Sequence, residues 1–109
     1  MGITKSELYT KRQNALAAMA KALAHPARIA ILQELLKTQS CVCGSLVDTV
    51  GLAQPTISQH LKELRDAGLI KGEIEAPKVR YCINKENWDI ARRLFSDLFD
   101  CFNGDGLIC

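Results

Sequence analysis

Residues 41–84 constrain the fold of this chain more than any other stretch. Pro55 stands where the first turn of a helix is expected, since a missing N–H has no cost at that position. Ile57, Leu61 and Leu64 then recur at helical spacing and form one apolar stripe. Gly68 is placed to end the helix in a left-handed conformation. This pattern predicts an amphipathic helix that begins near residues 54–55.

A shorter helix is predicted before it, over residues 43–50, with Gly51 at its end. Two helices joined by a short turn that contains glycine are the signature of a helix-turn-helix. Short amide, hydroxyl and imidazole side chains on the exposed face of the second helix suit the base edges of a DNA major groove. An ordinary helical hairpin with a solvated face is the alternative. The predicted DNA contacts on this helix are Gln54, Thr56, Ser58, Gln59 and His60, with Lys62 on a phosphate.

Two strands are predicted after this helix, over residues 69–75 and 79–84, with a turn at 76–78. The second strand alternates apolar and polar side chains, as a half-buried strand does, and this places Cys82 on its exposed face. Arg80 adds positive charge that could reach a phosphate. A helix-turn-helix followed directly by a basic hairpin is a winged helix.

Helices are also predicted over residues 6–23, from Pro26 onward, and over 86–102. The helix from Pro26 should bury Ile29, Leu32, Leu35 and Leu36. The two terminal helices carry more apolar surface than the edge of a small domain needs, which favours a homodimer. Its predicted interface residues are Leu16, Met19, Leu94, Phe95 and Leu98.

The expected fold class is therefore mainly α with a small β-hairpin, a dimeric winged helix-turn-helix. One domain should cover residues 1–109, with the helix-turn-helix at 41–68, the wing at 69–84 and dimerisation helices at 6–23 and 86–102. Two-fold symmetry would match the symmetry of a typical operator.

Composition agrees with a single domain that has a core, since 48% of the residues are hydrophobic. A net charge of +2 does not by itself identify a nucleic-acid protein. The chain shows neither the apolar core of a signal peptide nor an apolar run long enough to span a bilayer, so a cytoplasmic location is expected. Five cysteines, an odd number, do not indicate a disulfide framework. Metal ligation or thiol redox chemistry explains them better.

Four segments carry a resemblance to a known family: ALAHPARIAILQELL, CVCGSL, LAQPTISQHLKELRDAGLI and VRYCIN. They resemble the ArsR/SmtB family of metal-responsive winged-helix repressors over nearly the whole chain. The resemblance implies a transcriptional repressor, not an enzyme, that binds double-stranded operator DNA as a homodimer. It also implies that a bound inducer ion releases the DNA.

Cys41 and Cys43 resemble part of the ELCVCDLC motif of arsenic-sensing and cadmium- or lead-sensing members. Thiolates are soft ligands and suit arsenite, antimonite, cadmium and lead. At the start of the predicted helix the two thiols could converge, and the helix N-terminus would favour their thiolate forms. Two small buried cysteines without a ligand role are the alternative.

The family motif often has a third cysteine where this chain has Leu46. A third ligand would have to be Cys101 or Cys109, from the same subunit or its partner. Cys82 ranks last because it is predicted on the exposed face of the wing. The predicted metal ligands are therefore Cys41, Cys43, Cys101 and Cys109, with arsenite or antimonite as the inducer and no obligatory cofactor.

Other functions remain as alternatives. One is a cadmium or lead sensor of the same family, and another is a repressor whose cysteines are oxidised to a disulfide or polysulfide. The zinc site that other members carry on the last helix is not expected, because that helix contains no histidine. A thiol enzyme is disfavoured, since the sequence offers no catalytic dyad and no glycine-rich phosphate loop.

Overall fold

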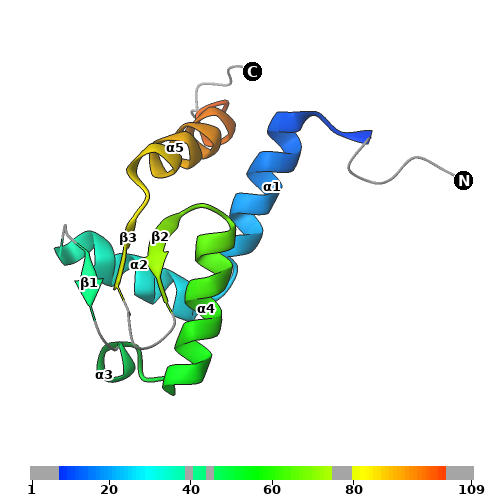
Figure 1. Ribbon diagram of the computed structural model, residues 1–109. Helices are drawn as coiled ribbons and strands as arrows, with labels where there is room; N and C mark the ends of the chain where they lie inside the picture. Colours follow the sequence, from blue (N-terminus) through cyan, green and yellow to red (C-terminus); the bar gives the residue numbers. More distant parts are fainter. Residues whose placement is uncertain (1–7, 39–40, 44–45, 75–79, 103–109) are drawn as a thin grey trace, which may run out of the picture.

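The computed structural model describes residues 8–38, 41–43, 46–74 and 80–102. The fold is mainly helical with a small antiparallel hairpin, as predicted (Figure 1). Its elements, in chain order, are α1 (Lys11–Leu23), α2 (Pro26–Thr38), β1 (Val42–Cys43), α3 (Val47–Val50), α4 (Gln54–Asp66), β2 (Ile70–Glu73), β3 (Arg80–Ile83) and α5 (Lys85–Phe99).

The first helix starts later than residue 6, because Thr10 caps it. The Thr10 hydroxyl accepts a hydrogen bond from the backbone N–H of Gln13 at 3.0 Å, and the Gln13 side chain accepts one from the Thr10 N–H at 2.9 Å. This reciprocal pair is a capping box, which fixes the helix start at Lys11. Leu8 to Thr10 therefore lie before the helix, and residues 1–7 lie outside the described part.

The predicted helix over residues 43–50 is shorter than expected. Val42 and Cys43 form a strand that pairs antiparallel with β3, and α3 begins only at Val47. Backbone pairing with the wing satisfies the N–H and C=O groups that a helix would otherwise satisfy, so a distant contact overrides the local pattern. Gly51 does end α3 as predicted, with φ 81°. The cysteines at 41–43 thus belong to a sheet and not to a helix start.

The sheet has the order β1-β3-β2, and both pairs are antiparallel. Gly72 of β2 pairs with Tyr81 of β3, and its φ angle is 130°. A Cβ atom on Gly72 would lie 2.1 Å from the backbone oxygen of Arg80. Glycine is therefore required at this close approach. The strands match the predicted wing, while its turn at 76–78 falls outside the described residues.

Helix α4 begins at Gln54 with proline in its first turn, as predicted, and Gly68 follows it with φ 84°. Helix α2 begins at Pro26 as predicted, but Ile29 and Leu36 are 38% and 37% exposed rather than buried. The buried face of α2 is instead formed by Ala27, Ile31 and Leu35, at a spacing of four residues, together with Leu32. The fully buried core side chains are Ile31, Leu35, Ile57, Leu61, Leu64, Leu69, Ile70 and Tyr81.

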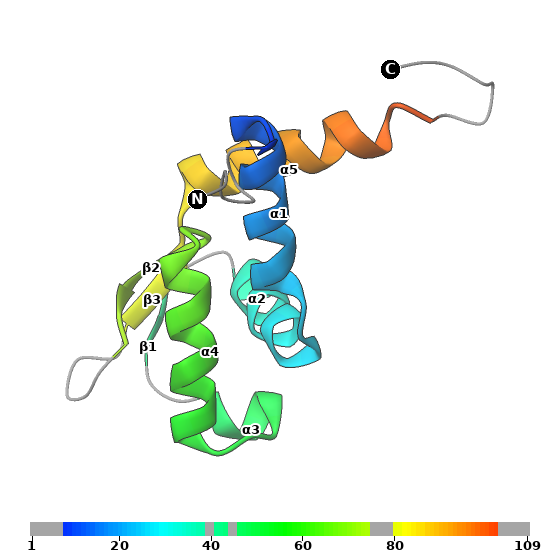
Figure 2. The same cartoon turned by 90° about the vertical axis from the view of Figure 1, so that its right-hand side faces the viewer.

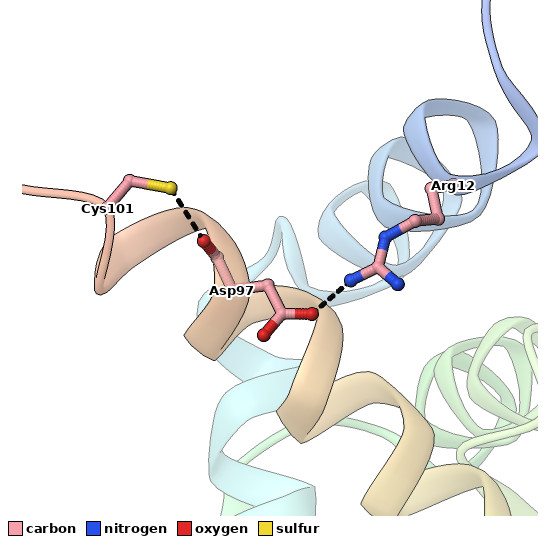
Figure 3. Close-up of polar contacts among 3 residues, drawn as sticks. All are labelled: Arg12, Asp97 and Cys101. Atoms are coloured by element: carbon pink, nitrogen blue, oxygen red, sulfur yellow. Dashed lines mark hydrogen bonds and ion pairs between the residues drawn. The ribbon is translucent and has the colours of Figure 1, made fainter. Parts of the chain in front are cut away.

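The two terminal helices lie at one end of the molecule, and α3 with the start of α4 lies at the other (Figures 1 and 2). Arg12 of α1 forms an ion pair with Asp97 of α5 where these two helices approach each other (Figure 3). Helix α5 is capped by Asn84 and starts and ends within three residues of its predicted bounds.

Within the described residues no single helix has the length and hydropathy to cross a bilayer. Helices α1 and α2 meet that standard only as a pair, and the pair is bent by 92°.

Two glycine variants test the close approach in the sheet. Both Gly51 and Gly72 have positive φ, but a Cβ at Gly51 meets nothing within 4 Å. We expect Gly51→Ala to lower the free energy of unfolding by about 1–2 kcal/mol through backbone strain alone. Gly72→Ala should cost about 3 kcal/mol or more, because backbone atoms must also move. Urea unfolding of both variants measures this, and equal losses would contradict the described strand contact.

Candidate nucleic-acid interface and cysteine site

Helix α4 presents a polar face because its apolar stripe is fully buried. Ile57, Leu61 and Leu64 have no exposed surface. The opposite face therefore turns outward, at the end of the molecule away from α5 (Figure 2). Thr56, Gln59 and Lys62 are exposed, as predicted, while Gln54 and Ser58 are half-buried.

The polar side chains of α4 are ordered along the helix by their own hydrogen bonds. The Gln54 amide donates to the Ser58 hydroxyl at 3.2 Å, and the Gln59 amide donates to the Glu63 carboxylate at 3.5 Å. These are i,i+4 neighbours on one helix surface. Each side chain keeps further hydrogen-bonding capacity, which is what reading a base edge requires.

A cleft of about 110 Å³ lies between this face and the base of the wing. Two cations, Lys62 and Arg65, line it on the helix side, and Ile74 lines it after β2. Arg80 and Lys71 are exposed on the strands. Exposed positive charge therefore occurs on the wing strands as well as on α4. Among the described residues, the cleft is lined by Pro55, Ser58, Gln59, Lys62, Arg65 and Ile74.

His60 does not lie on this exposed face, so the prediction that it does is wrong. Only 9% of its surface is exposed. Its Nδ1 atom accepts a hydrogen bond from Nε of Arg28 at 3.2 Å, and its ring lies 4.3 Å from the ring of His25. Position 60 is one residue before the buried Leu61 and three after the buried Ile57, which turns it toward α2 rather than outward.

Arg28 also fills a structural position, since it donates to the backbone oxygen of Ala22 at 3.2 Å as well as to His60. It thereby joins the end of α1 to α2 and α4, and satisfies a carbonyl that the helix leaves unpaired. The pKa of His60 lies below its ordinary value, because burial disfavours the charged ring and the nearby His25 and Arg28 repel a proton. Glu63 opposes this shift.

Two of the cysteines are joined to each other across the sheet. Cys41 and Cys82 form a disulfide with their Cα atoms 4.3 Å apart. Both residues are half-buried. Cys82, ranked last among the candidate third ligands, is therefore the cysteine that lies next to Cys41, because the pairing of β1 with β3 brings the two together. A thiol at Leu46 would not have completed such a site, since Leu46 is buried in the core.

The remaining cysteines are placed differently. The backbone of Cys43 pairs with that of Arg80. Cys101 follows α5, and its sulfur lies 3.0 Å from the backbone oxygen of Asp97 (Figure 3). The end of α5 lies far from β1 in both views (Figures 1 and 2). Cys109 lies outside the described residues, and the described part contains no group of three His, Cys, Asp or Glu side chains able to hold a metal ion.

The lowered pKa of His60 predicts a pH-dependent stability. Since the unfolded chain takes up this proton more readily than the folded chain, neutral His60 contributes stability above about pH 6.5, and that contribution is lost as pH falls toward the folded pKa. We expect His60→Gln, which keeps an acceptor for Arg28, to make the free energy of unfolding depend less on pH between pH 7 and 5. Urea unfolding at each pH and an NMR titration of the ring measure this. A ring that titrates at or above its ordinary pKa would contradict the buried environment.

Comparison with known proteins places the chain in a family. The profile described as "Bacterial regulatory protein, arsR family" matches residues 25–71. The chain is 48% identical over 61 residues to the HTH-type transcriptional repressor SmtB of Mycobacterium tuberculosis H37Rv. That match covers 56% of this chain and 44% of SmtB, so the chain spans less than half the length of that relative.

Two further matches cover more of the molecule. The HTH-type transcriptional regulator YgaV of Escherichia coli K12 is 39% identical over 70 residues, which cover 64% of this chain and 71% of YgaV. The crystal structure of the transcriptional repressor BigR from Xylella fastidiosa superposes with a TM-score of 0.60 and 27% identity, over 94% of this chain and all of BigR. The sequence matches and the structural match indicate the same family. The chain belongs to the arsR family of bacterial regulatory proteins.

Proposed function

We propose that this chain is a transcriptional repressor that binds double-stranded operator DNA and releases it when an inducer reacts with its cysteine thiols. The observation that carries the proposal is the exposed polar face of α4. It lies at the end of the molecule away from α5, beside the cleft lined by Lys62 and Arg65. SmtB and BigR, to which the chain is similar, are both transcriptional repressors, and this supports repression as the outcome of DNA binding.

The DNA contact is proposed through α4 and the wing together. The rigid packing of Ile57, Leu61 and Leu64 fixes the direction in which Gln59 and Thr56 point. Amide and hydroxyl groups on that face would read base edges in the major groove. Lys62 and Arg80 would hold phosphates on either side, which fixes the position of the helix without reading sequence.

A homodimer is part of the proposal. Large apolar side chains near the end of α5 are exposed: Leu98 by 53%, Phe99 by 67% and Phe102 by 77%. The Arg12–Asp97 ion pair places α1 beside them, so both terminal helices can form one surface. A second copy of the chain would cover this surface and give two copies of α4 related by a two-fold axis.

The first candidate inducer is a thiophilic metal(loid), arsenite or antimonite before cadmium or lead. Thiolates from Cys41 and Cys43 would bind it, and Cys101 or Cys109 would complete the site, from the same subunit or its partner. The sulfur of Cys82 lies within bonding distance of that of Cys41, so the reduced sheet also offers a dithiol pair at this place. Soft ions of this class favour such thiolate ligands.

The second candidate is thiol oxidation, and one observation favours it. Cys41 and Cys82 are joined in a disulfide. Disulfides in reducing compartments are in most cases transient or redox-sensing. In this case an oxidant or a reactive sulfur species, and not an ion, would release the DNA.

Alanine variants test the DNA contact. A duplex can be obtained by selection from a random-sequence library with the reduced protein. We expect Gln59→Ala to weaken binding to that duplex by about 1–3 kcal/mol, because a base contact is lost. Gln33→Ala, an exposed glutamine on α2, should have no effect and serves as the matched control. Arg80→Gln should weaken binding to all sequences and reduce the salt slope by about one. Two chains per duplex are expected, and equal affinities for the Gln59 and Gln33 variants would exclude this face.

A metal titration tests the first candidate inducer. Reduced protein on the selected duplex is titrated with arsenite, cadmium, lead and zinc. We expect arsenite to act at the lowest concentration and zinc not to act. An ion that prefers the released form by about 3 kcal/mol weakens DNA binding roughly a hundredfold. Replacing Cys41 and Cys43 by serine should abolish release. If that double variant still releases its DNA at the same arsenite concentration, the ion binds elsewhere.

A further inference from the structure

We propose that Cys41 and Cys82 form a reversible thiol–disulfide site, which ties β1 to the wing when it is oxidised and thereby weakens DNA binding. The site itself follows from the sheet register, whereas its effect on DNA rests on the function proposed above. It names a cysteine pair that the CVC motif alone does not indicate.

The register of the sheet makes these two cysteines direct neighbours. Val42 pairs with Tyr81, and Cys43 pairs with Arg80. One step further along the same antiparallel register, Cys41 stands opposite Cys82. Their Cα distance of 4.3 Å is close to that of a directly opposed pair without backbone hydrogen bonds. The bond therefore forms between residues that the strands already hold together, and it can open without separating the strands first.

The same register places a cation beside the pair. Lys71 of β2 is the partner of Cys82 on the other side of β3. Directly opposed residues share a face of the sheet, so Lys71, Cys82 and Cys41 form a row across it. Tyr81, next to Cys82, is buried in the core, so this row lies on the outer face. An exposed ammonium group favours a thiolate at its neighbour, and the thiolate is the nucleophile in disulfide exchange.

The reaction needs a two-electron oxidant, which we assign to the class of low-molecular-weight disulfides. The thiolate of one cysteine attacks a sulfur of the small disulfide and expels one small thiol. The second cysteine thiolate then attacks the mixed disulfide and expels the other small thiol. The two cysteine thiols are oxidised to one S–S bond, and the small disulfide is reduced to two thiols that carry the two protons.

The position of the bond explains why it would affect DNA binding. Strand β1 has only two residues, and helix α3 begins four residues after it, ahead of α4. In the reduced state β1 is held by backbone pairing with β3 and by the packing of Val42 against the core, with no covalent bond to the wing, so the wing and α4 can adjust to a duplex together. The bond removes this freedom by fixing the segment before α3 to β3. A repressor bound through both elements then loses part of its contact.

The experiment uses the full chain equilibrated in mixtures of reduced and oxidised glutathione. Peptide mapping after alkylation should find the Cys41–Cys82 bond, and oxidation should weaken binding to the selected duplex at least about tenfold, reversibly. Cys82→Ser should keep the affinity of the reduced chain under both conditions. Absence of the bond, or an unchanged or raised affinity when it forms, overturns the proposal. A response that needs Cys101 but not Cys82 overturns it as well.

Two measurements do not depend on DNA. Amide hydrogen exchange at Val42 should become at least about tenfold faster on reduction, because the covalent bond between β1 and β3 is then lost. Lys71→Gln should slow bond formation by glutathione disulfide at least about threefold, whereas Lys37→Gln, on α2, should not. If no duplex binds in either state, the proposed function fails, yet these measurements still decide the site. Unchanged exchange at Val42, or equal rates for the two lysine variants, would contradict it.

Discussion

The burial of one face of α4 is the constraint on which the rest of this structure depends. Ile57, Leu61 and Leu64 are fully buried against the α2 side of the core and the sheet. Burying them fixes the rotation of the helix about its own axis and leaves its polar side to the solvent. Recognition by side chains needs such a fixed orientation, since a small rotation would move every donor and acceptor away from a base edge.

A second constraint is the short strand β1, which connects the sheet to the helix-turn-helix. It places Cys41 opposite Cys82 and the start of α3 close behind. In the function proposed here, chemistry at these sulfurs would act on the geometry between the wing and α4, and not only on local stability. The same coupling serves an ion or an oxidant, because both would change how tightly β1 is held to β3.

Local patterns in the sequence were sufficient for the helix starts at Pro26 and Gln54, the stripe on α4 and the wing strands. They did not predict the features that depend on contacts between residues far apart in the sequence. Nothing near Val42 indicates a two-residue strand, because its partner lies in the wing, and so the pairing of Cys82 with Cys41 was not predicted. His60 looked polar and exposed, but Arg28, from another helix, supplies the hydrogen bond that allows its burial. The exposure of Ile29 and Leu36 likewise depends on how α2 is rotated by its neighbours.

NMR chemical shifts of the reduced chain, recorded with and without the selected duplex, test the central claim most directly. If α4 and the wing form the DNA-binding face, the largest shifts should fall on the amides of residues 54–62 and of β2 and β3. The amides at the centre of α2 should change little. Largest shifts on α2 or on the exposed end of α5, with α4 unaffected, would contradict the account.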